Sequence, residues 1–171
     1  MPARIEFREL VPADFPMLRA WFQDPEVVEW WAPPRDLPSI RAKYLPRLLG
    51  EEATSMWVIV IDGVNAGLAQ SYRHVDHPAH DAVVGIADAA GIDYLLTVAF
   101  RGRGLAPDVL SALAAHALAS HRGTTVCVAT PSTANVKSCR ALERAGFERR
   151  AEITGVGGFR ETVYAMTPDR P

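Results

Sequence analysis

The amino-acid sequence predicts an α+β fold in which a mixed, mostly antiparallel central sheet is flanked by helices. Segments in which apolar and polar residues alternate predict strands, and segments with apolar residues at helical spacing predict helices. Their order along the chain is β-α-α-β-β-β-α-β-α-β-β, which favours antiparallel neighbours over a regular series of parallel units. A length of 171 residues suffices for one buried core, so residues 1–171 are expected to form a single domain.

The first third of the chain is predicted to contain one strand and two helices. Residues 4–10 alternate as an edge strand does, and residues 12–23 have helical spacing with a proline in the first turn. Residues 39–49 form a second predicted helix, which Pro46 is expected to kink or end. The segment between these helices, residues 27–34, holds two tryptophans and two prolines and is predicted to be irregular.

A hairpin followed by a long loop is predicted in the middle of the chain. Residues 56–61 are continuously apolar, and the Asp-Gly pair at residues 62–63 is a hairpin signal that leads to a strand at residues 67–73. Residues 74–90 are polar and lack periodicity. They are therefore predicted to form a loop, with residues 82–86 as a candidate short strand.

The second half of the chain begins with a clear strand and the strongest helical pattern. Residues 91–98 alternate cleanly, and residues 105–120 have apolar side chains at helical spacing. A further helix at residues 135–145 is expected to end before Gly146, because glycine adopts the left-handed conformation that follows many helices. The remaining predicted strands lie at residues 124–129, 147–153 and 161–166.

Composition and charge exclude several classes of protein. The net charge of −2 and the pI of about 6.2 give no basic surface of the kind that binds nucleic acid or an anionic membrane. The longest apolar run is too short to cross a bilayer, and the N-terminal residues lack the apolar segment of a signal peptide. Two cysteines, Cys127 and Cys139, cannot form a disulfide framework and fit a reducing compartment. We expect a cytoplasmic protein that is a monomer or a weak homodimer.

The most informative segment is the glycine-rich turn at residues 101–106, Arg-Gly-Arg-Gly-Leu-Ala, between a predicted strand and a predicted helix. Glycines allow backbone N–H groups to point into one concavity, and the helix N-terminus adds partial positive charge. The two arginines add cationic groups. These features suit a bound pyrophosphate, although the spacing matches neither a Walker A loop nor the dinucleotide fingerprint.

This turn resembles motif A of the GNAT acetyltransferase superfamily, with Arg101, Gly104 and Ala106 at the matching positions. Asn135 and the run Ala-Leu-Glu-Arg-Ala-Gly-Phe at residues 141–147 resemble its motif B. The resemblance implies a GNAT fold in which two strands splay apart at the acetyl-coenzyme A site. The residues it implies for cofactor binding are Leu95, Leu96, Thr97, Val98, Arg101, Gly102, Arg103, Gly104, Leu105, Ala106, Asn135 and Ser138.

Within this superfamily the chain is most similar to single-domain aminoglycoside 6′-N-acetyltransferases. Four pieces carry the similarity in the correct order, at residues 28–31, 44–46, 69–72 and 91–96. The resemblance implies transfer of an acetyl group from acetyl-coenzyme A to a primary amine of a polyamine or aminoglycoside, and the expected acceptor is the 6′-amine of an aminoglycoside antibiotic. The residues expected to bind this acceptor are Glu29, Trp30, Trp31, Tyr44, Gln70, Tyr72, Asp88 and Asp93.

Asp93 is the predicted catalytic base. An amine with a pKa near 10.4 is protonated at pH 7, so freeing its lone pair costs about 4–5 kcal/mol. A carboxylate can attract the ammonium group and accept its proton, directly or through water. The freed amine would attack the thioester directly, and backbone N–H groups of residues 95–98 would hold the oxyanion. Cys127 lies in an apolar strand and is not expected to be a nucleophile.

Two departures from the family pattern leave alternatives open. Leu142 occupies the position where the family commonly has a tyrosine that protonates the departing thiolate, and Thr130 and Pro131 stand where the resembled enzymes carry an acid. A thiol pKa near 8.5 makes thiolate a fair leaving group without that tyrosine. The alternatives are an acceptor amine of the siderophore hydroxylysine type, a protein amine, or a coenzyme A-binding protein without catalysis.

A histidine-rich segment supplies a further candidate site. His74, His77 and His80 alternate with Asp76 and Asp81, which are side chains that metals accept as ligands. A proline-containing loop would give these groups no fixed geometry. The segment is therefore expected to be solvated, with no metal bound.

Overall fold

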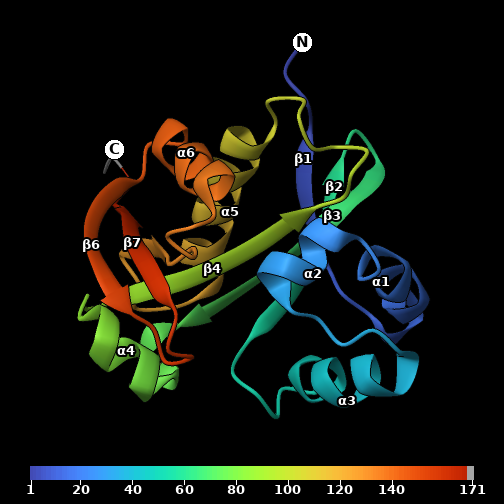
Figure 1. Cartoon of the computed structure of the whole chain (residues 1–171), viewed down its shortest axis with the longest axis horizontal. Helices are drawn as coiled ribbons and strands as arrows, with labels where there is room; N and C mark the ends of the chain where they lie inside the picture. Colours follow the sequence, from blue (N-terminus) through green and yellow to red (C-terminus); the bar gives the residue numbers. More distant parts are fainter. Residues whose placement is uncertain (169–171) are drawn as a thin grey trace. The chain divides into compact units, whose positions relative to one another are not determined.

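The computed structural model describes residues 1–168 and contains a seven-stranded sheet with the strand order β1-β2-β3-β4-β5-β7-β6 (Figure 1). The pairs β1–β2, β5–β7 and β6–β7 are antiparallel, and the pair β4–β5 is parallel. The prediction of a mixed, mostly antiparallel sheet is confirmed. The strands are β1 (Ile5–Glu9), β2 (Ser55–Ile61), β3 (Val64–Arg73), β4 (Ala89–Leu96), β5 (Val126–Ala129), β6 (Glu148–Thr154) and β7 (Arg160–Met166).

Three α-helices lie between β1 and β2, and one α-helix follows each of β3, β4 and β5. The 3-10 turns are η1 (Pro12–Asp14) and η2 (His74–Asp76), and the α-helices are α1 (Phe15–Trp21), α2 (Pro25–Trp31), α3 (Leu37–Leu48), α4 (Pro78–Val84), α5 (Ala106–Ser120) and α6 (Val136–Arg144). Among residues 1–168, no helix combines the length and the apolar character that crossing a bilayer requires.

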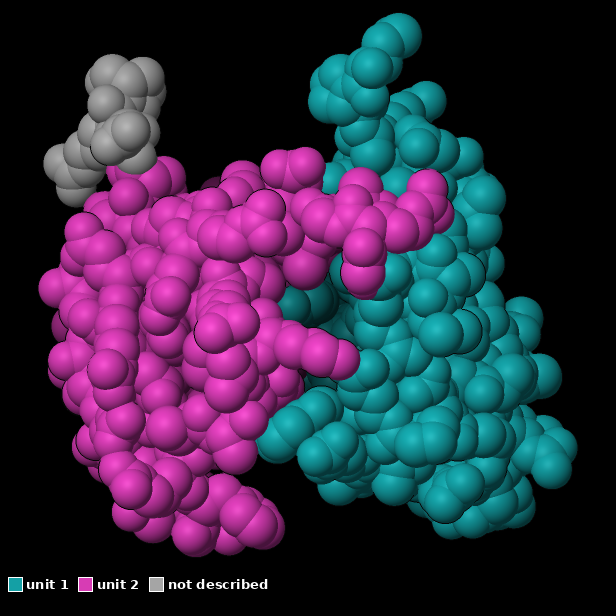
Figure 2. All heavy atoms as spheres, turned by 45° about the horizontal axis from the view of Figure 1, so that its top comes forward, with its two compact units in different colours: residues 1–70, 94–101 teal, residues 71–93, 102–171 magenta. Residues whose placement is uncertain are grey.

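The chain divides into two compact units, which Figure 2 shows in different colours. Unit 1 comprises residues 1–70 and 94–101, and unit 2 comprises residues 71–93 and the chain from residue 102 onward. Strands β3 and β4 each contribute their residues to both units.

The core of unit 1 is built where α1 and α3 pack together and α3 packs on β2. Phe15 and Leu18 lie three residues apart on α1, so both point into the same apolar cluster as Ile40 and Tyr44 of α3. Each large apolar side chain that is fully removed from water contributes roughly 1.5–3 kcal/mol to the free energy of folding. This cluster therefore fixes α3, which carries Tyr44, one of the predicted acceptor residues.

A two-residue turn joins β2 to β3. Asp62 and Gly63 both have positive φ angles, of 50° and 80°, as the preferred two-residue hairpin turn requires. The predicted hairpin is confirmed. The second strand begins at Val64, three residues earlier than predicted, because so short a turn leaves no residues unpaired before the strand resumes.

One buried cluster of unit 2 lies on one face of the sheet. Ala89, Val128, Val163 and Ala165 form a buried cluster, against which side chains from α4 and the segment after it pack. Helices α5 and α6 pack against each other, and the Ser111 hydroxyl of α5 donates a hydrogen bond of 3.2 Å to the carbonyl of Ala145. The long helix predicted at residues 105–120 is confirmed.

Strand β4 is paired with β5 over only part of its length. The parallel ladder of the described residues runs from Ala89–Val126 to Gly91–Val128, and β5 ends at Ala129 while β4 continues to Leu96. The two strands thus stop pairing before the end of β4. This is the local arrangement that the predicted splayed pair of strands requires.

The prediction of an irregular segment at residues 27–34 is wrong, because α2 covers most of it. Asp24 caps this helix by accepting a hydrogen bond of 2.9 Å from the N–H of Glu26, and Pro25 occupies its first position. The helix ends at Ala32, which has a left-handed φ of 46°. Its cap, Asp24, lies six residues before Trp30, outside the segment that holds the two tryptophans.

The prediction of a loop at residues 74–90 is also wrong. The segment contains η2, α4 and the start of β4. Pro78 opens α4, and Gly85, with a φ of 67°, ends it. The candidate strand at residues 82–86 therefore lies partly in this helix. At seven residues, α4 is too short to display a clear helical period.

Pro46 does not end α3, which runs two residues beyond it. The proline lies in the last turn of the helix, where its missing N–H removes only one hydrogen bond. Its own carbonyl accepts a hydrogen bond of 2.8 Å from the N–H of Glu51.

Candidate active site

The turn between β4 and α5 has the backbone conformation that an anion cradle needs. The carbonyl of Thr97 accepts hydrogen bonds from the N–H groups of Phe100 and Arg101, at 2.9 and 3.1 Å. Gly102 and Gly104 follow with left-handed φ angles of 70° and 73°, and no atom lies within 4 Å of a Cβ built at either position. An exposed stretch of backbone, in which only Arg103 carries a side chain between the two glycines, thus leads to the N-terminus of α5.

The side chain of Arg101 is engaged by two carboxylates of its own unit. One guanidinium nitrogen donates to Glu26 Oε2 at 2.6 Å, and the other contacts Asp24 Oδ2. Burial raises the pKa of Asp24, but the hydrogen bond and the charge of Arg101 outweigh it and lower that pKa overall. Arg101 therefore ties the end of β4 to the N-terminus of α2, and the backbone of the turn is left as the main candidate for phosphate recognition.

The backbone N–H groups of residues 95–98, which are expected to hold the oxyanion, differ in whether they are free to donate. The N–H of Thr97 donates to the carbonyl of Ala66 on β3 at 2.9 Å, so it is occupied. Because N–H groups alternate between the two edges of a strand, Leu95 faces the same edge as Thr97, and Leu96 faces the opposite edge. Val98 lies beyond β4 and is 73% exposed. Leu96 is thus the candidate backbone donor on the edge away from β3.

Asn135 and Ser138, both predicted to bind coenzyme A, are brought together at the start of α6. The Asn135 side chain caps the helix by accepting a hydrogen bond of 3.3 Å from the N–H of Ser138. Leu142, on the same helix, is buried with 1% of its surface exposed. Its position offers no proton donor.

Two of the expected acceptor residues meet in unit 1. The indole N–H of Trp31 donates to the Tyr44 hydroxyl at 3.1 Å, and Tyr44 is fully buried beside Phe22. Burial raises the pKa of Tyr44. Tyr44 is therefore a core residue that fixes Trp31, whereas Trp30 and Glu29 on the same helix are exposed.

Gln70 lies beside a cation that sequence analysis missed. Its carbonyl oxygen accepts a hydrogen bond of 2.8 Å from Arg47, whose guanidinium also contacts Glu52 at 3.1 Å. The guanidinium carbon of Arg47 lies 5.5 Å from the centre of the Tyr44 ring, and the amine of Lys43 lies 5.6 Å from it. Burial and the charge of Arg47 lower the pKa of Lys43. This part of unit 1 is cationic.

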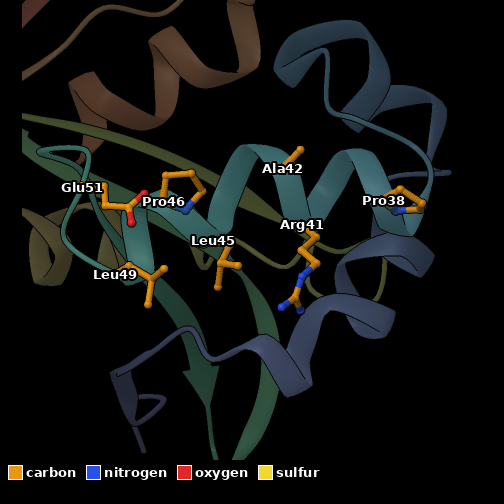
Figure 3. Close-up of a pocket in the computed structure, with 7 residues that line it drawn as sticks. All are labelled: Pro38, Arg41, Ala42, Leu45, Pro46, Leu49 and Glu51. Atoms are coloured by element: carbon orange, nitrogen blue, oxygen red, sulfur yellow. The ribbon is translucent and has the colours of Figure 1, made fainter.

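A shallow groove of about 400 Å³ follows the outer face of α3 and the loop after it (Figure 3). Its lining is mostly apolar and includes none of the residues that were expected to bind cofactor or acceptor. The lining residues are Pro38, Arg41, Ala42, Leu45, Pro46, Leu49 and Glu51.

Two carboxylates gather around Tyr72 in unit 2. Burial, the charges of Asp93 and Glu161, and the hydrogen bond that the phenol donates to Asp93 raise the pKa of Tyr72 well above its ordinary value. Burial and the charge of Asp93 also raise the pKa of Glu161. Glu161 makes no ion pair among the described residues. Asp93 thus belongs to a half-buried anionic pair.

Asp88 does not join this pair. It lies at the other end of β4, five residues before Asp93, which corresponds to about 16 Å along an extended strand. It is exposed, and its carbonyl accepts a hydrogen bond of 2.8 Å from Thr125. The structure therefore separates Asp88 from the other expected acceptor residues of unit 2.

Glu161 was not predicted, although the sequence contains a signal for it. It alternates with Val163 and Ala165 along β7, so an acid lies on the face that these two residues bury. A charge on a buried strand face is costly unless it has a partner or a function. The hydrogen bond between Arg47 of α3 and Gln70, by contrast, joins residues 23 positions apart, so no local sequence pattern predicts it.

The expectation that the histidine segment is solvated is wrong. His74 is fully buried, and its ring lies 4.7 Å from the ring of His80 between centres. Burial lowers the pKa of His74 to about 4. A search of the described residues finds no group of three ligating side chains arranged to hold a metal ion. Cys127 is also fully buried, and burial raises the pKa of its thiol.

We predict that the protein loses stability as the pH falls from 6.5 toward 4. Below pH 6.5 the unfolded chain takes up a proton at His74 that the folded chain does not, so stability falls by about 2 kcal/mol between pH 7.5 and pH 5. Urea unfolding at the two pH values measures this difference. His74→Phe keeps a buried ring and should remove the share of the loss that His74 causes, while His80, His116 and His121, whose pKa values burial also lowers, still contribute. An undiminished loss in that variant would contradict the assignment.

The chain matches known acetyltransferases in sequence and in structure. The family model described as an acetyltransferase (GNAT) domain matches residues 11–155. An aminoglycoside N(6′)-acetyltransferase type 1 from Klebsiella pneumoniae is 29% identical over 168 residues, which cover 90% of this chain and 79% of that protein. The crystal structure of aminoglycoside acetyltransferase AAC(6′)-Ib with coenzyme A and kanamycin is 28% identical, with a TM-score of 0.81 over 96% of this chain and 95% of its own. This chain belongs to the GNAT acetyltransferase family.

Proposed function

We propose that this protein transfers the acetyl group of acetyl-coenzyme A to a primary amine of an aminoglycoside, with the 6′-amine as the favoured position. The observation that carries this proposal is the anionic pair of Asp93 and Glu161 beside Tyr72. Two neighbouring carboxylates favour a ligand with ammonium groups. The similarity to enzymes that acetylate aminoglycosides supports the choice of acceptor.

The turn at residues 101–106 is the proposed cradle for the coenzyme A pyrophosphate. Its left-handed glycines leave the backbone uncovered, and the N-terminus of α5 follows immediately. Bound acetyl-coenzyme A supplies an activated acyl thioester. The Leu96 N–H is the proposed donor to the oxygen that becomes negative during transfer, and Asn135 and Ser138 are proposed to line the same cofactor from α6.

Asp93 is the proposed base. An acceptor ammonium loses two protons when it becomes an amide, of which one leaves with the coenzyme A thiol and the other has to be removed. A carboxylate in β4 lies three residues before Leu96, so it is close along the chain to the proposed oxyanion donor. Glu161 is proposed to bind a second ammonium group of the acceptor and so to orient it.

The family model covers residues of both compact units, which supports a single acetyltransferase domain over residues 1–171. Both cysteines are free thiols, and this favours the reducing cytoplasm as the place of action. A monomer or a weak homodimer remains the expected state.

A second acceptor class is favoured by Arg47 and Lys43. These cations surround Tyr44 and Gln70 in unit 1, and a cationic surface repels a further ammonium group while it attracts a carboxylate. A hydroxylysine-type amine carries an ammonium group and a carboxylate, so it would use both the carboxylates of unit 2 and the cations of unit 1. Substitution of a cation on α3 can therefore distinguish the two candidate acceptor classes.

Asp93→Asn should lower kcat by about 10²–10⁴-fold at pH 7, because the amide cannot accept the proton of the ammonium group. Activity should recover in part at higher pH, where more of the acceptor is already neutral. Steady-state kinetics with kanamycin between pH 6 and pH 9.5 measure both effects. Asp62→Asn makes the same change in an exposed turn and serves as the control. Wild-type kinetics for folded Asp93→Asn would exclude it as the base.

Gly104→Val should raise the KM for acetyl-coenzyme A by at least about tenfold, because a branched side chain in the left-handed conformation strains the turn and covers its backbone. Gly123→Val is the matched control, since Gly123 has a φ of 79° and equally open surroundings after α5. Equal cofactor KM values for the two variants would refute the pyrophosphate assignment.

Arg47→Gln distinguishes the two acceptor classes. If the acceptor is a polycationic sugar, loss of this cation should leave kcat/KM for kanamycin unchanged or raise it. If the acceptor carries a carboxylate, kcat/KM for N6-hydroxylysine should fall by about tenfold or more. Arg41→Gln changes an exposed cation of the same helix and controls for the general loss of charge.

A further inference from the structure

Three imidazoles surround the ring of Tyr72. His74 stacks on it with 5.8 Å between ring centres, and His77 and His80 meet it edge-on at 4.9 and 6.1 Å. His74 and His80 also contact each other at 4.7 Å. His74 lies in η2, His77 caps the N-terminus of α4 and His80 lies in α4, so the ring of Tyr72 at the end of β3 is enclosed by the segment that follows its own strand.

No hydrogen bond in the described structure offsets the burial of the His74 ring. Its side chain is fully buried, and neither ring nitrogen has a hydrogen-bond partner in the described structure; Nε2 of His80 is likewise without one. Burying an unpaired polar group costs about 1–3 kcal/mol. An apolar ring would fill the same space without that cost, so packing alone does not account for histidine here.

The Tyr72 side chain also lies against the backbone of β4. A Cβ atom built on Gly91 would lie 2.4–2.9 Å from three atoms of the Tyr72 ring, closer than real side-chain contacts allow. Only glycine at this position permits the ring to lie so near the strand. Gly91 is two residues before Asp93, and both point to the same face of β4.

This enclosure fixes the direction of the Tyr72 hydroxyl. The phenol donates to Asp93, and the groups that act on Asp93 from the elements around it are Tyr72 of β3, His80 of α4 and Glu161 of β7. His77 and Asp81 act on His80, and Cys127 of β5 acts on Tyr72. Burial lowers the pKa of His74 and His80, which leaves both rings uncharged at neutral pH. The phenol therefore donates its hydrogen bond to Asp93, and no positive charge on these two rings competes with it.

We propose that Tyr72 is a positioning residue, held by His74, His77, His80 and Gly91, whose hydroxyl orients the Asp93 carboxylate and favours its ionised form. The inference rests on the proposed role of Asp93 as base. It replaces the expectation that Tyr72 binds the acceptor. The phenol holds the Asp93 carboxylate in the orientation in which it would meet the ammonium group.

Tyr72→Phe tests this role, because it removes the hydroxyl and keeps the ring between the histidines. A hydrogen bond to a charged group is worth about 1.5–3 kcal/mol, so loss of it should raise the Asp93 pKa by roughly one unit or more. The acid limb of the kcat/KM profile with kanamycin should move to higher pH by the same amount. Activity above pH 8.5 should approach that of the wild type, which a general loss of packing would not produce.

Tyr164→Phe is the matched control, since the Tyr164 hydroxyl donates to a different carboxylate, Glu143, at 2.9 Å. It should leave the acid limb in place. NMR titration of the Asp93 carboxyl carbon in wild type and Tyr72→Phe measures the shift without turnover, so it also serves if the variant is weakly active. His74→Leu should produce a smaller shift in the same direction.

The outcomes separate this inference from the proposed function. An unchanged Asp93 titration in folded Tyr72→Phe, together with an inactive Asp93→Asn, would overturn the positioning role and leave the base in place. Wild-type activity in both variants would overturn the proposed base itself. A shifted titration with an inactive Asp93→Asn supports the positioning role.

Discussion

The constraint on which the proposed chemistry depends is that Asp93 has to remain charged on a sheet face that is otherwise apolar. Ala89 and Gly91 precede it on the same side of β4, and both are buried. A carboxylate in such surroundings needs a donor or a cation, and the phenol of Tyr72 is one such donor within unit 2. The glycine at position 91 and the histidines around the ring fit this requirement, whereas the neighbouring Glu161 opposes it by like-charge repulsion.

The extent to which the fold could be predicted depended on the length of each element. The 15-residue helix α5 repeats its apolar period several times, and the β2–β3 hairpin has a turn that few residue pairs adopt. Helices α2 and α4, with seven residues each, show barely two turns of any period. Their prolines and caps were the only local evidence for them, and these same residues are typical of loops.

The candidate site was predictable where one short segment carries its chemistry. The turn at residues 101–106 and the carboxylate of Asp93 are both visible in consecutive residues. The partners of these groups are not, because Tyr72, Glu161 and Asp93 come from three strands that are far apart in the sequence. The ion pairs of Arg101 with Asp24 and Glu26 likewise join residues more than 70 positions apart. Such contacts exist only in the folded chain.

The engagement of Arg101 by two acids also bears on how the enzyme responds to salt. A free arginine fork would bind phosphate largely by charge, and that attraction weakens as ionic strength rises. With this guanidinium neutralised inside unit 1, the proposed phosphate contacts would come from backbone N–H groups and the first turn of α5, which act at hydrogen-bonding distance. The proposed pyrophosphate contacts would then weaken less with rising ionic strength than those of a free arginine fork.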